Sequence, residues 1–546
     1  MKNVSIVLSL FFVIFVSGCI SPDITNEIKF VSVEPRENPS PWTMYRYDIE
    51  HSGVNAQEKL LAKETVNNLK PIWKLDGNGF FATSTIINNS VYFGELQSLK
   101  SEFYSLQLND GSVKWKTVLE PVNNYAWDRG IAGSATYENG ILYIGNHEAV
   151  IYSLNASDGS VIWQTNLNKP LPEVYKQIFK LGLPEWERHP RFPATEEYYL
   201  HHDPDAIMTS PLVVNDKIFV GIASNTADLP CSTGRVVALN KENGEVIWER
   251  LMVPDRTDLV GAEQMIDEDN SSYEGYNFGA GVWATPTYDK KLNRLYIATG
   301  NPCGDVNIHP DRYPFNYGHS IVALNPDTGD VIWAFTKTEF VGQDLDFGSS
   351  PLIFNNTNGN RYVGDLSKGG VFVAIRTDMT LNEQGITLIN SSHLSGSVGW
   401  EVNIAPAGES PHDAGGINSA SFVDGKIFVG TGRKPFAGRY TGEKEAGFLA
   451  LSPEDGKILM EYDLTFTPLG ASAAANGIVF FSDGRSVVAI DTSSEGINPK
   501  PLWISQKLED IQGGIFDYIQ PLLGGISISN GYLLVGSVNS LYAFSV

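Results

Sequence analysis

The chain has 546 residues, of which 42% are hydrophobic and 11% aromatic, and it contains 52 Gly and 29 Pro. This composition argues against a disordered chain and is typical of a turn-rich all-β protein. The formal net charge of −24 argues against nucleic acid as a partner, because such binding depends on Lys and Arg side chains that contact phosphates.

The first 18 residues are predicted to be an export signal. Lys2 precedes an apolar run, residues 4–16, that is too short to span a bilayer comfortably. The sequence VSGC at residues 16–19 resembles a lipoprotein lipobox, so we expect lipidation of Cys19 and a flexible tether over residues 19–39. The protein would then be an exported, membrane-anchored lipoprotein facing the periplasm or the cell exterior, with membrane contact through the lipid only. An ordinary signal peptide or an uncleaved anchor is the alternative.

A repeated phrase dominates the rest of the chain. Each copy has the pattern of a strand, an Asp/Asn-Gly turn and a second strand, as in IYSLNASDGSVIW, and four copies end at Trp115, Trp163, Trp248 and Trp333. A diverged copy, FLALSPEDGKILM, has Met460 in place of the tryptophan. Because one such hairpin cannot bury its own apolar face, the repeat predicts stacked units of the same kind.

About eight units follow one another from residue 70 to the end, each with the content of one four-stranded blade. The sequence therefore predicts an all-β fold in which residues 40–546 form a single eight-bladed β-propeller. Two long insertions, residues 170–205 and 255–278, interrupt the repeat. Insertions in such arrays usually collect on one face, so we expect these two to cover the site and to shape the substrate.

The repeated phrase resembles the tryptophan-docking motif of the quinoprotein alcohol dehydrogenases, eight-bladed propellers that carry pyrroloquinoline quinone (PQQ). The segment SPWTMYRYDIEHSGVN at residues 40–55 resembles the family's opening segment. The resemblance implies PQQ- and Ca²⁺-dependent oxidation of a small-molecule or polymeric alcohol by hydride transfer to the quinone. No C-x-x-C-H haem motif occurs, so electrons would pass to an external acceptor such as a cytochrome.

Similar repeats also occur in non-catalytic propeller lipoproteins, so an envelope scaffold or binding module is the competing hypothesis, and a degenerate former enzyme is a third. The fold alone does not choose among them. A scaffold has no reason to gather the family's site residues around one axis. The residues that do not repeat therefore carry the functional prediction.

The segment GAGVWATPTYDKKLNRLYIATGNP at residues 279–302 resembles the family segment that supplies a tryptophan below the quinone and an asparagine that ligates calcium. By position these are Trp283 and Asn301. A flat indole can stack on a flat quinone, and an amide oxygen suits a hard cation. The alternatives are a core aromatic residue and a turn residue.

The sequence GQDLDFGSSP at residues 342–351 resembles the context of the family's catalytic aspartate. Asp346 matches best, and beside bound Ca²⁺ it would ligate the metal and accept the alcohol proton. An Asp-capped turn is the alternative. A lanthanide enzyme would have an extra acid two residues after the base, a position that Gly348 occupies if Asp346 is the base. If Asp344 is the base, Asp346 becomes that extra ligand.

Three further positions match the family around the loop that follows residue 208. Asp228, in SNTADLPCSTG, corresponds to a carboxylate ligand of calcium, with aspartate where the best-known enzymes have glutamate. Thr209 and Ser224 correspond to PQQ-binding residues. For Asp228 the alternative is a solvated surface turn.

Two cations and an amide complete the implied cofactor contacts. Arg129, in WDRGIAG, corresponds to an arginine that binds a PQQ carboxylate through its planar fork. Lys368, in LSKGG, corresponds to a basic residue that contacts the quinone oxygens and assists catalysis, and Asn418 corresponds to another cofactor contact. For each of the two cations the alternative is a surface charge.

The chain also departs from the family pattern. Asn123 and Asn124 stand where many members have adjacent cysteines, and Leu469 replaces a second tryptophan near the cofactor. The resemblance further implies that Cys231 and Cys303 flank one calcium site, where they could form a disulfide if their Cα atoms lie within about 7 Å. Two unrelated cysteines are the alternative.

Overall fold

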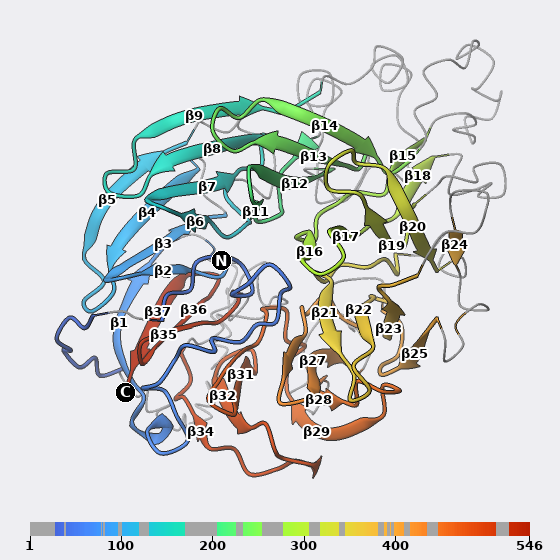
Figure 1. Cartoon of the computed structure of the whole chain (residues 1–546). Coiled ribbons are helices and arrows are strands. Elements are labelled where there is room, and N and C mark those ends of the chain that lie inside the picture. Colours follow the sequence, from blue (N-terminus) through green and yellow to red (C-terminus); the bar gives the residue numbers. More distant parts are fainter. Residues whose placement is uncertain are drawn as a thin grey trace, which may run out of the picture.

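The computed structural model describes the chain from residue 28 to residue 546 with gaps. The described ranges are 28–37, 40–77, 79, 82–96, 101–119, 130–169, 205–224, 233–253, 277–304, 317–337, 344–379, 387–389, 394, 398–408, 415–433, 446–508 and 524–546. Figure 1 shows their strands as sheets arranged around a central axis like the blades of a propeller. The predicted eight-bladed β-propeller is confirmed.

The first four blades follow one another along the chain, the inner strand of each preceding its outer strands, and a later segment adds an outermost strand to blade 4. Blade 1 contains β2 (Thr85–Ile87), β3 (Ser90–Gly94), β4 (Glu102–Gln107) and β5 (Val113–Val118). Blade 2 contains β6 (Thr136–Glu138), β7 (Ile141–Gly145), β8 (Val150–Asn155) and β9 (Val161–Asn166). Blade 3 contains β10 (Asp205–Ala206), β11 (Leu212–Val214), β12 (Lys217–Ser224), β13 (Arg235–Asn240) and β14 (Val246–Leu251). Blade 4 contains β16 (Thr287–Asp289), β17 (Arg294–Ala298), β19 (Ser320–Leu324), β20 (Val331–Thr336) and β24 (Thr387–Ile389).

The other four blades complete the ring. Blade 5 contains β21 (Leu352–Asn355), β22 (Arg361–Leu366), β23 (Val371–Arg376) and β25 (Gly399–Asn403). Blade 6 contains β26 (Ser421–Val423), β27 (Lys426–Gly432), β28 (Ala446–Leu451), β29 (Ile458–Leu464) and β33 (Gly496–Ile497). Blade 7 contains β30 (Ala473–Ala475), β31 (Ile478–Ser482), β32 (Val487–Asp491) and β34 (Trp503–Ile504). Blade 8 contains β35 (Ser527–Ser529), β36 (Tyr532–Gly536), β37 (Ser540–Ser545) and β1 (Lys70–Asp76).

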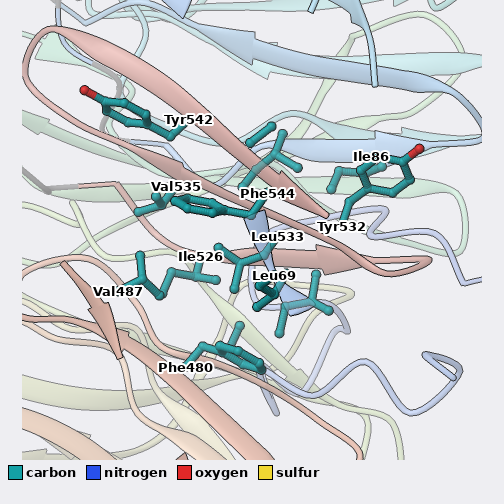
Figure 2. Close-up of a cluster of buried hydrophobic side chains, with 14 of the residues drawn as sticks. Leu69, Ile86, Phe480, Val487, Ile526, Tyr532, Leu533, Val535, Tyr542 and Phe544 are labelled. Carbon is teal, nitrogen blue, oxygen red and sulfur yellow. The ribbon is translucent and has the colours of Figure 1, made fainter. Parts of the chain in front are cut away.

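Blade 8 closes the ring with strands from both ends of the chain. Strand β1 pairs antiparallel with β37 from Lys70 opposite Ser545 to Asp76 opposite Ser540. Figure 2 shows the apolar side chains that pack here, with Ile86 of blade 1, Phe544 of blade 8 and Phe480 of blade 7 among them. Burial of this shared cluster holds the last blade to its two neighbours.

The repeated tryptophans join successive blades. Trp115 of blade 1 donates from Nε1 to the Ala156 carbonyl at 3.1 Å, and a Cβ at Gly159 would lie 2.5 Å from its ring. The glycine of one repeat thus leaves room for the tryptophan of the preceding repeat. The same packing occurs at Trp73 with Gly111, Trp163 with Gly244, Trp248 with Gly329 and Trp400 with Gly456.

A belt of hydroxyl groups also connects blades 2 to 6 near the axis. In each case a backbone N–H just before an inner strand donates to a side-chain hydroxyl of the next blade. The pairs are Ser134 to Ser210, Ser210 to Thr285, Thr285 to Ser350 and Ser350 to Ser419, at 2.8 to 3.0 Å. The belt fixes how each site-bearing loop sits against its neighbour.

An inner segment, residues 42–55, follows the inside of the ring (Figure 1). It bonds to the innermost strands of seven blades, because each of those strands has an unpaired edge facing the axis. Its backbone partners are Ile86, Tyr137, Tyr288, Ile353, Phe422 and Ala474, and the Asn55 amide donates to the Ile528 carbonyl at 2.8 Å. Arg46 is buried in this segment and donates to the Ser472 and Ala420 carbonyls.

The predicted signal, the lipobox with Cys19 and much of the tether lie outside the described residues. The described part of the tether contacts blade 8, since Arg36 donates to the Val546 carbonyl at 2.8 Å and lies over the Tyr532 ring. The one helix described is η1 (Val66–Asn68). In the part of the chain that is described, no helix is long and apolar enough to cross a membrane.

Candidate active site

The loop before β21 carries Asp346, the predicted base, and Asp344, the alternative to it. It is attached to the end of β22, because the Lys368 N–H donates to the Asp346 carbonyl at 2.9 Å and Phe347 forms an antiparallel bridge with Ser367. The pairing brings the aspartates and Lys368 to the same end of blade 5.

Blade 4 repeats this arrangement with Trp283 before its inner strand β16 and Asn301 after β17. The Gly300 N–H donates to the Gly281 carbonyl at 2.8 Å, and the Ala280 N–H donates to the Asn301 carbonyl at 2.6 Å. A two-stranded ribbon of β15 (Asn277–Gly279) and β18 (Pro302–Gly304) lies beside Asn301. Equivalent loops of two adjacent blades therefore supply the site.

Four predicted residues meet in one cluster together with Asp344. The Lys368 ammonium lies 2.7 Å from Asp344 Oδ1 and 2.7 Å from Asp346 Oδ1. Trp283 donates from Nε1 to Asp346 Oδ2 at 3.2 Å, and Asn301 donates from Nδ2 to Asp344 Oδ1 at 2.5 Å. Lys368 Nζ also lies 5.4 Å from the centroid of the Trp283 ring, within cation–π range. We call these five residues the aspartate cluster.

Burial differs sharply across the aspartate cluster. Asp346 is 2% exposed and Lys368 is 6% exposed, whereas the Asp344 side chain is 39% exposed. Burial acts to lower the pKa of Lys368, but Asp346 and Asp344 together outweigh it and raise that pKa above its usual value. Lys368 is therefore a cation at neutral pH and can serve as an electrophilic partner, not as a base.

The donor set of the aspartate cluster fits a hard cation. Asp346 Oδ1 is buried, and its close polar neighbour is the Lys368 ammonium at 2.7 Å. The carboxylates of Asp344 and Asp346 are ligands that such cations prefer, whereas Asn301 directs Nδ2 to Asp344 and Oδ1 to His319 and would have to turn its amide to ligate a cation. Within the described ranges, no group of three or more His, Cys, Asp or Glu side chains is placed to hold a metal. The third predicted carboxylate, Asp228, lies outside those ranges.

His319 is a member of the site that the sequence analysis missed. Its Nε2 lies 2.9 Å from Asn301 Oδ1, and its backbone N–H donates to the Gly300 carbonyl. It is buried, so it supports Asn301 from behind. The sequence gives little indication of this role, because His319 only precedes the repeated strand SIVALN and belongs to no motif.

Glycines make room for the Trp283 ring. A Cβ at Gly348 would lie 2.2 Å from Trp283 Cη2, and one at Gly300 would lie 3.0 Å from Asp346 Oδ2. The position two residues after Asp346 is thus filled by the indole of Trp283, which leaves no space there for an acidic side chain.

Thr209 and Asn418 occupy the same place in blades 3 and 6. Both are fully buried, and each accepts a backbone N–H from a glycine twelve residues later, Gly221 or Gly430, at 3.0 Å. Asn418 also donates to the Gly470 carbonyl at 2.5 Å. No contact found among the described residues joins either side chain to the aspartate cluster.

Several predicted residues cannot be placed. Arg129, Asp228 and Cys231 lie outside the described residues, as do Asn123 and Asn124, and nothing is described of the side chains of Ser224 and Cys303. The backbone nearby is described: Thr233 forms a bridge with Gly279, which pairs with Pro302. Almost all of the two insertions also falls outside the described ranges.

Two family models match parts of the chain. The PQQ family model, described as the β-propeller domain of glucose, ethanol and alcohol dehydrogenases, matches residues 194–371. A model for the outer membrane protein assembly factor BamB matches residues 99–269. Both matches fall on the repeat region.

Several individual relatives are dehydrogenases of alcohols. The quinoprotein alcohol dehydrogenase PedH of Pseudomonas putida is 30% identical over 173 residues, 30% of this chain and 28% of that protein. The lanthanide-dependent methanol dehydrogenase of Methylorubrum extorquens is 29% identical over 199 residues, 31% of this chain and 32% of that protein. The polyvinylalcohol dehydrogenase of a Pseudomonas species is 22% identical over 385 residues, 59% of this chain and 52% of that protein. The matched part thus spans about a third to a half of these relatives.

Solved structures share the architecture. The quinohemoprotein alcohol dehydrogenase from Comamonas testosteroni superposes with a TM-score of 0.62 at 15% identity, covering 93% of this chain and 80% of that one. A europium-containing methanol dehydrogenase gives a TM-score of 0.61 at 15% identity, with 93% and 98% covered. At this identity the likeness establishes the fold.

Proposed function

We propose that the protein oxidises an alcohol with PQQ and a metal ion at the aspartate cluster; the match of residues 194–371 to the PQQ family model and the quinoprotein relatives support this proposal. One observation carries the proposal: Trp283, Asn301, Asp346 and Lys368 converge from two blades on one cluster. Convergence of this kind has no purpose in a scaffold.

Each described residue has a chemical role in the proposed reaction. Trp283 offers a flat apolar surface for the quinone ring, and Lys368 offers a fixed positive charge for a quinone oxygen. Asp346 accepts the alcohol proton, because its carboxylate is buried and oriented by the Trp283 N–H. PQQ, when bound, supplies the two-electron acceptor for the hydride. Arg129, Thr209, Ser224 and Asn418 remain the proposed further cofactor contacts.

We propose calcium as the metal ion, held by Asp346, Asn301 and Asp228. The packing of Trp283 against Gly348 supports Asp346 as the base, since no acid can follow it at the lanthanide position. With Asp344 as the base, Asp346 would be the added acid. Competition between Ca²⁺ and La³⁺ for reconstitution of activity distinguishes the two arrangements.

The experiment is reconstitution of the purified full-length protein with PQQ and Ca²⁺, followed by dye reduction with methanol, ethanol, longer alcohols and polyvinyl alcohol. We expect PQQ-dependent reduction that Asp346→Asn abolishes, with Asp110→Asn, in an exposed turn, as the matched control. Absence of a rate under every combination would favour the envelope scaffold or binding module. Electrons are expected to leave to an external acceptor such as a cytochrome.

We also propose that Cys19 is lipidated and that Cys231 and Cys303 form a disulfide. Mass spectrometry of the protein recovered from its native membrane tests the lipid, with Cys19→Ser as the control that should be released from the membrane. Peptide mapping without reductant tests the disulfide. Recovery of both thiols alkylated would remove that pairing.

A further inference from the structure

Asp365 is a third carboxyl group near the aspartate cluster, and the proposed reaction does not use it. It lies in β22, three residues before Lys368, and is 1% exposed. Its Oδ1 contacts the Ser349 hydroxyl and accepts the Leu366 N–H at 2.8 Å. Its Oδ2 is buried with no hydrogen-bond partner, and Asp365 forms no ion pair within the described ranges.

These surroundings suit a neutral acid. An ionised Asp365 would be a buried charge without a counter-ion, which is strongly unfavourable. A protonated Asp365 can instead donate to Ser349 Oγ, which leaves the Ser349 hydroxyl free to donate to the Leu366 carbonyl 3.2 Å away. Burial raises the pKa of Asp365 well above its usual value, in the same direction.

The contact joins the two segments that carry the reacting charges. Ser349 belongs to the loop of Asp344 and Asp346, and Asp365 belongs to the strand that leads to Lys368. The backbone already pairs these segments at Asp346 with Lys368 and at Phe347 with Ser367. The Asp365–Ser349 contact extends this pairing by a further step, deeper in the blade.

We propose that Asp365 is a positioning residue, which as a neutral acid holds Ser349 and thereby sets the separation of Asp346 and Lys368. The inference rests on the proposed function, because that separation matters for binding a cation and a quinone. A neutral acid also limits the local charge. Asp344, Asp346 and Lys368 together carry one net negative charge, and ionised Asp365 would add a second.

The test compares Asp365→Asn with Asp365→Ala in the purified full-length protein. Asn keeps the shape and neutrality of the acid, whereas Ala removes the contact. Terbium luminescence sensitised by Trp283 reports cation binding without PQQ or turnover. We expect about tenfold weaker terbium binding in Asp365→Ala, as for partners behind metal ligands, and a change within about twofold in Asp365→Asn. Ser349→Ala should resemble Asp365→Ala, and the double variant should add little, because the two side chains act as one unit.

An infrared difference spectrum between the wild type and Asp365→Asn supplies a second readout. At pH 7 the wild type should show the carbonyl band of a protonated carboxyl group, which the variant lacks. Absence of the band, or equal damage from Asn and Ala, would overturn the inference. If the wild type binds no terbium, the proposed cation site is wrong. The Asp365–Ser349 contact is then judged by the infrared band and by whether Asp365→Asn, but not Asp365→Ala, preserves the unfolding temperature.

Discussion

The side chains of the aspartate cluster differ in how much their charges depend on neighbouring residues for stabilisation. Asp344 is partly in water, but Asp346 is almost fully buried and relies on Lys368 for opposite charge and on Trp283 for a hydrogen bond. Removing one member of a buried ion pair costs more stability than the intact pair contributes, because the remaining charge stays buried without a partner. Lys368 is thus the residue whose removal the cluster should tolerate least.

Lys368→Met should lower the free energy of unfolding by about 3 kcal/mol, because Asp346 loses its buried counter-charge. Added Ca²⁺ should recover part of the loss, since a cation at the carboxylates replaces the ammonium. Urea unfolding with and without Ca²⁺ measures both effects, with Lys457→Met, on a solvent-exposed turn, as the control. Unchanged stability of Lys368→Met would contradict the buried-pair interpretation.

Asp483 should make stability depend on pH. It accepts the Thr465 N–H, and burial raises its pKa to about 6. Because the folded state holds this proton more tightly than the unfolded state, the contribution is full below about pH 4 and is lost as the pH rises through 6. Unfolding of the wild type and Asp483→Asn from pH 4 to 7 should show the wild type losing stability relative to the variant. A constant difference would refute the assignment.

At the scale of elements, the strands and inter-blade contacts could be predicted where the sequence repeats, but not where it does not repeat. The strand–turn–strand phrase indicated the blades, and its glycines and tryptophans proved to be the two halves of one inter-blade contact, as at Trp115 and Gly159. Trp73 and Trp400 make the same contact but were missed, because the residues around them do not match the phrase. The hydroxyl belt was not predictable either, since isolated Ser and Thr residues carry no periodic signal.

The same limit applies to the site. Trp283, Asn301, Asp346 and Lys368 came from matched motifs, and the structure brings them together. His319 and Asp365 could not be found this way, because their importance arises from contacts between strands distant in sequence. Burial and an unpaired oxygen, which only the fold reveals, mark Asp365.

Gly244→Ala tests the inter-blade contact. Gly244 has φ +74°, and its new Cβ would lie 2.5 Å from the Trp163 ring, so both backbone strain and overlap oppose alanine. Gly425→Ala is a matched control, with φ +73° and nothing within 4 Å of the new Cβ. We expect a loss of about 1 kcal/mol in the control and about 2 kcal/mol more in Gly244→Ala by urea unfolding. Equal losses would mean that the tryptophan contact imposes no steric limit.

For the whole molecule, closure depends on the shared blade 8. Removal of residues 537–546 deletes β37, which pairs with β1 and with β36. We expect this truncation to abolish a single cooperative unfolding transition in calorimetry. Removal of residues 1–37 should leave the transition in place, because the described part of that region contributes no strand to a blade. A cooperative transition in the first truncation would show that the ring closes without β37.

The inner segment has a consequence for the order of assembly. Residues 42–55 are synthesised before any blade, yet their bonding partners lie in seven blades, the last of them at Ile528. During synthesis these residues have no bonding partners at first, because contacts so distant in sequence form late. The segment cannot reach its final position until nearly the whole chain exists, so a part of the propeller that is made before every blade is among the last to be bound in place.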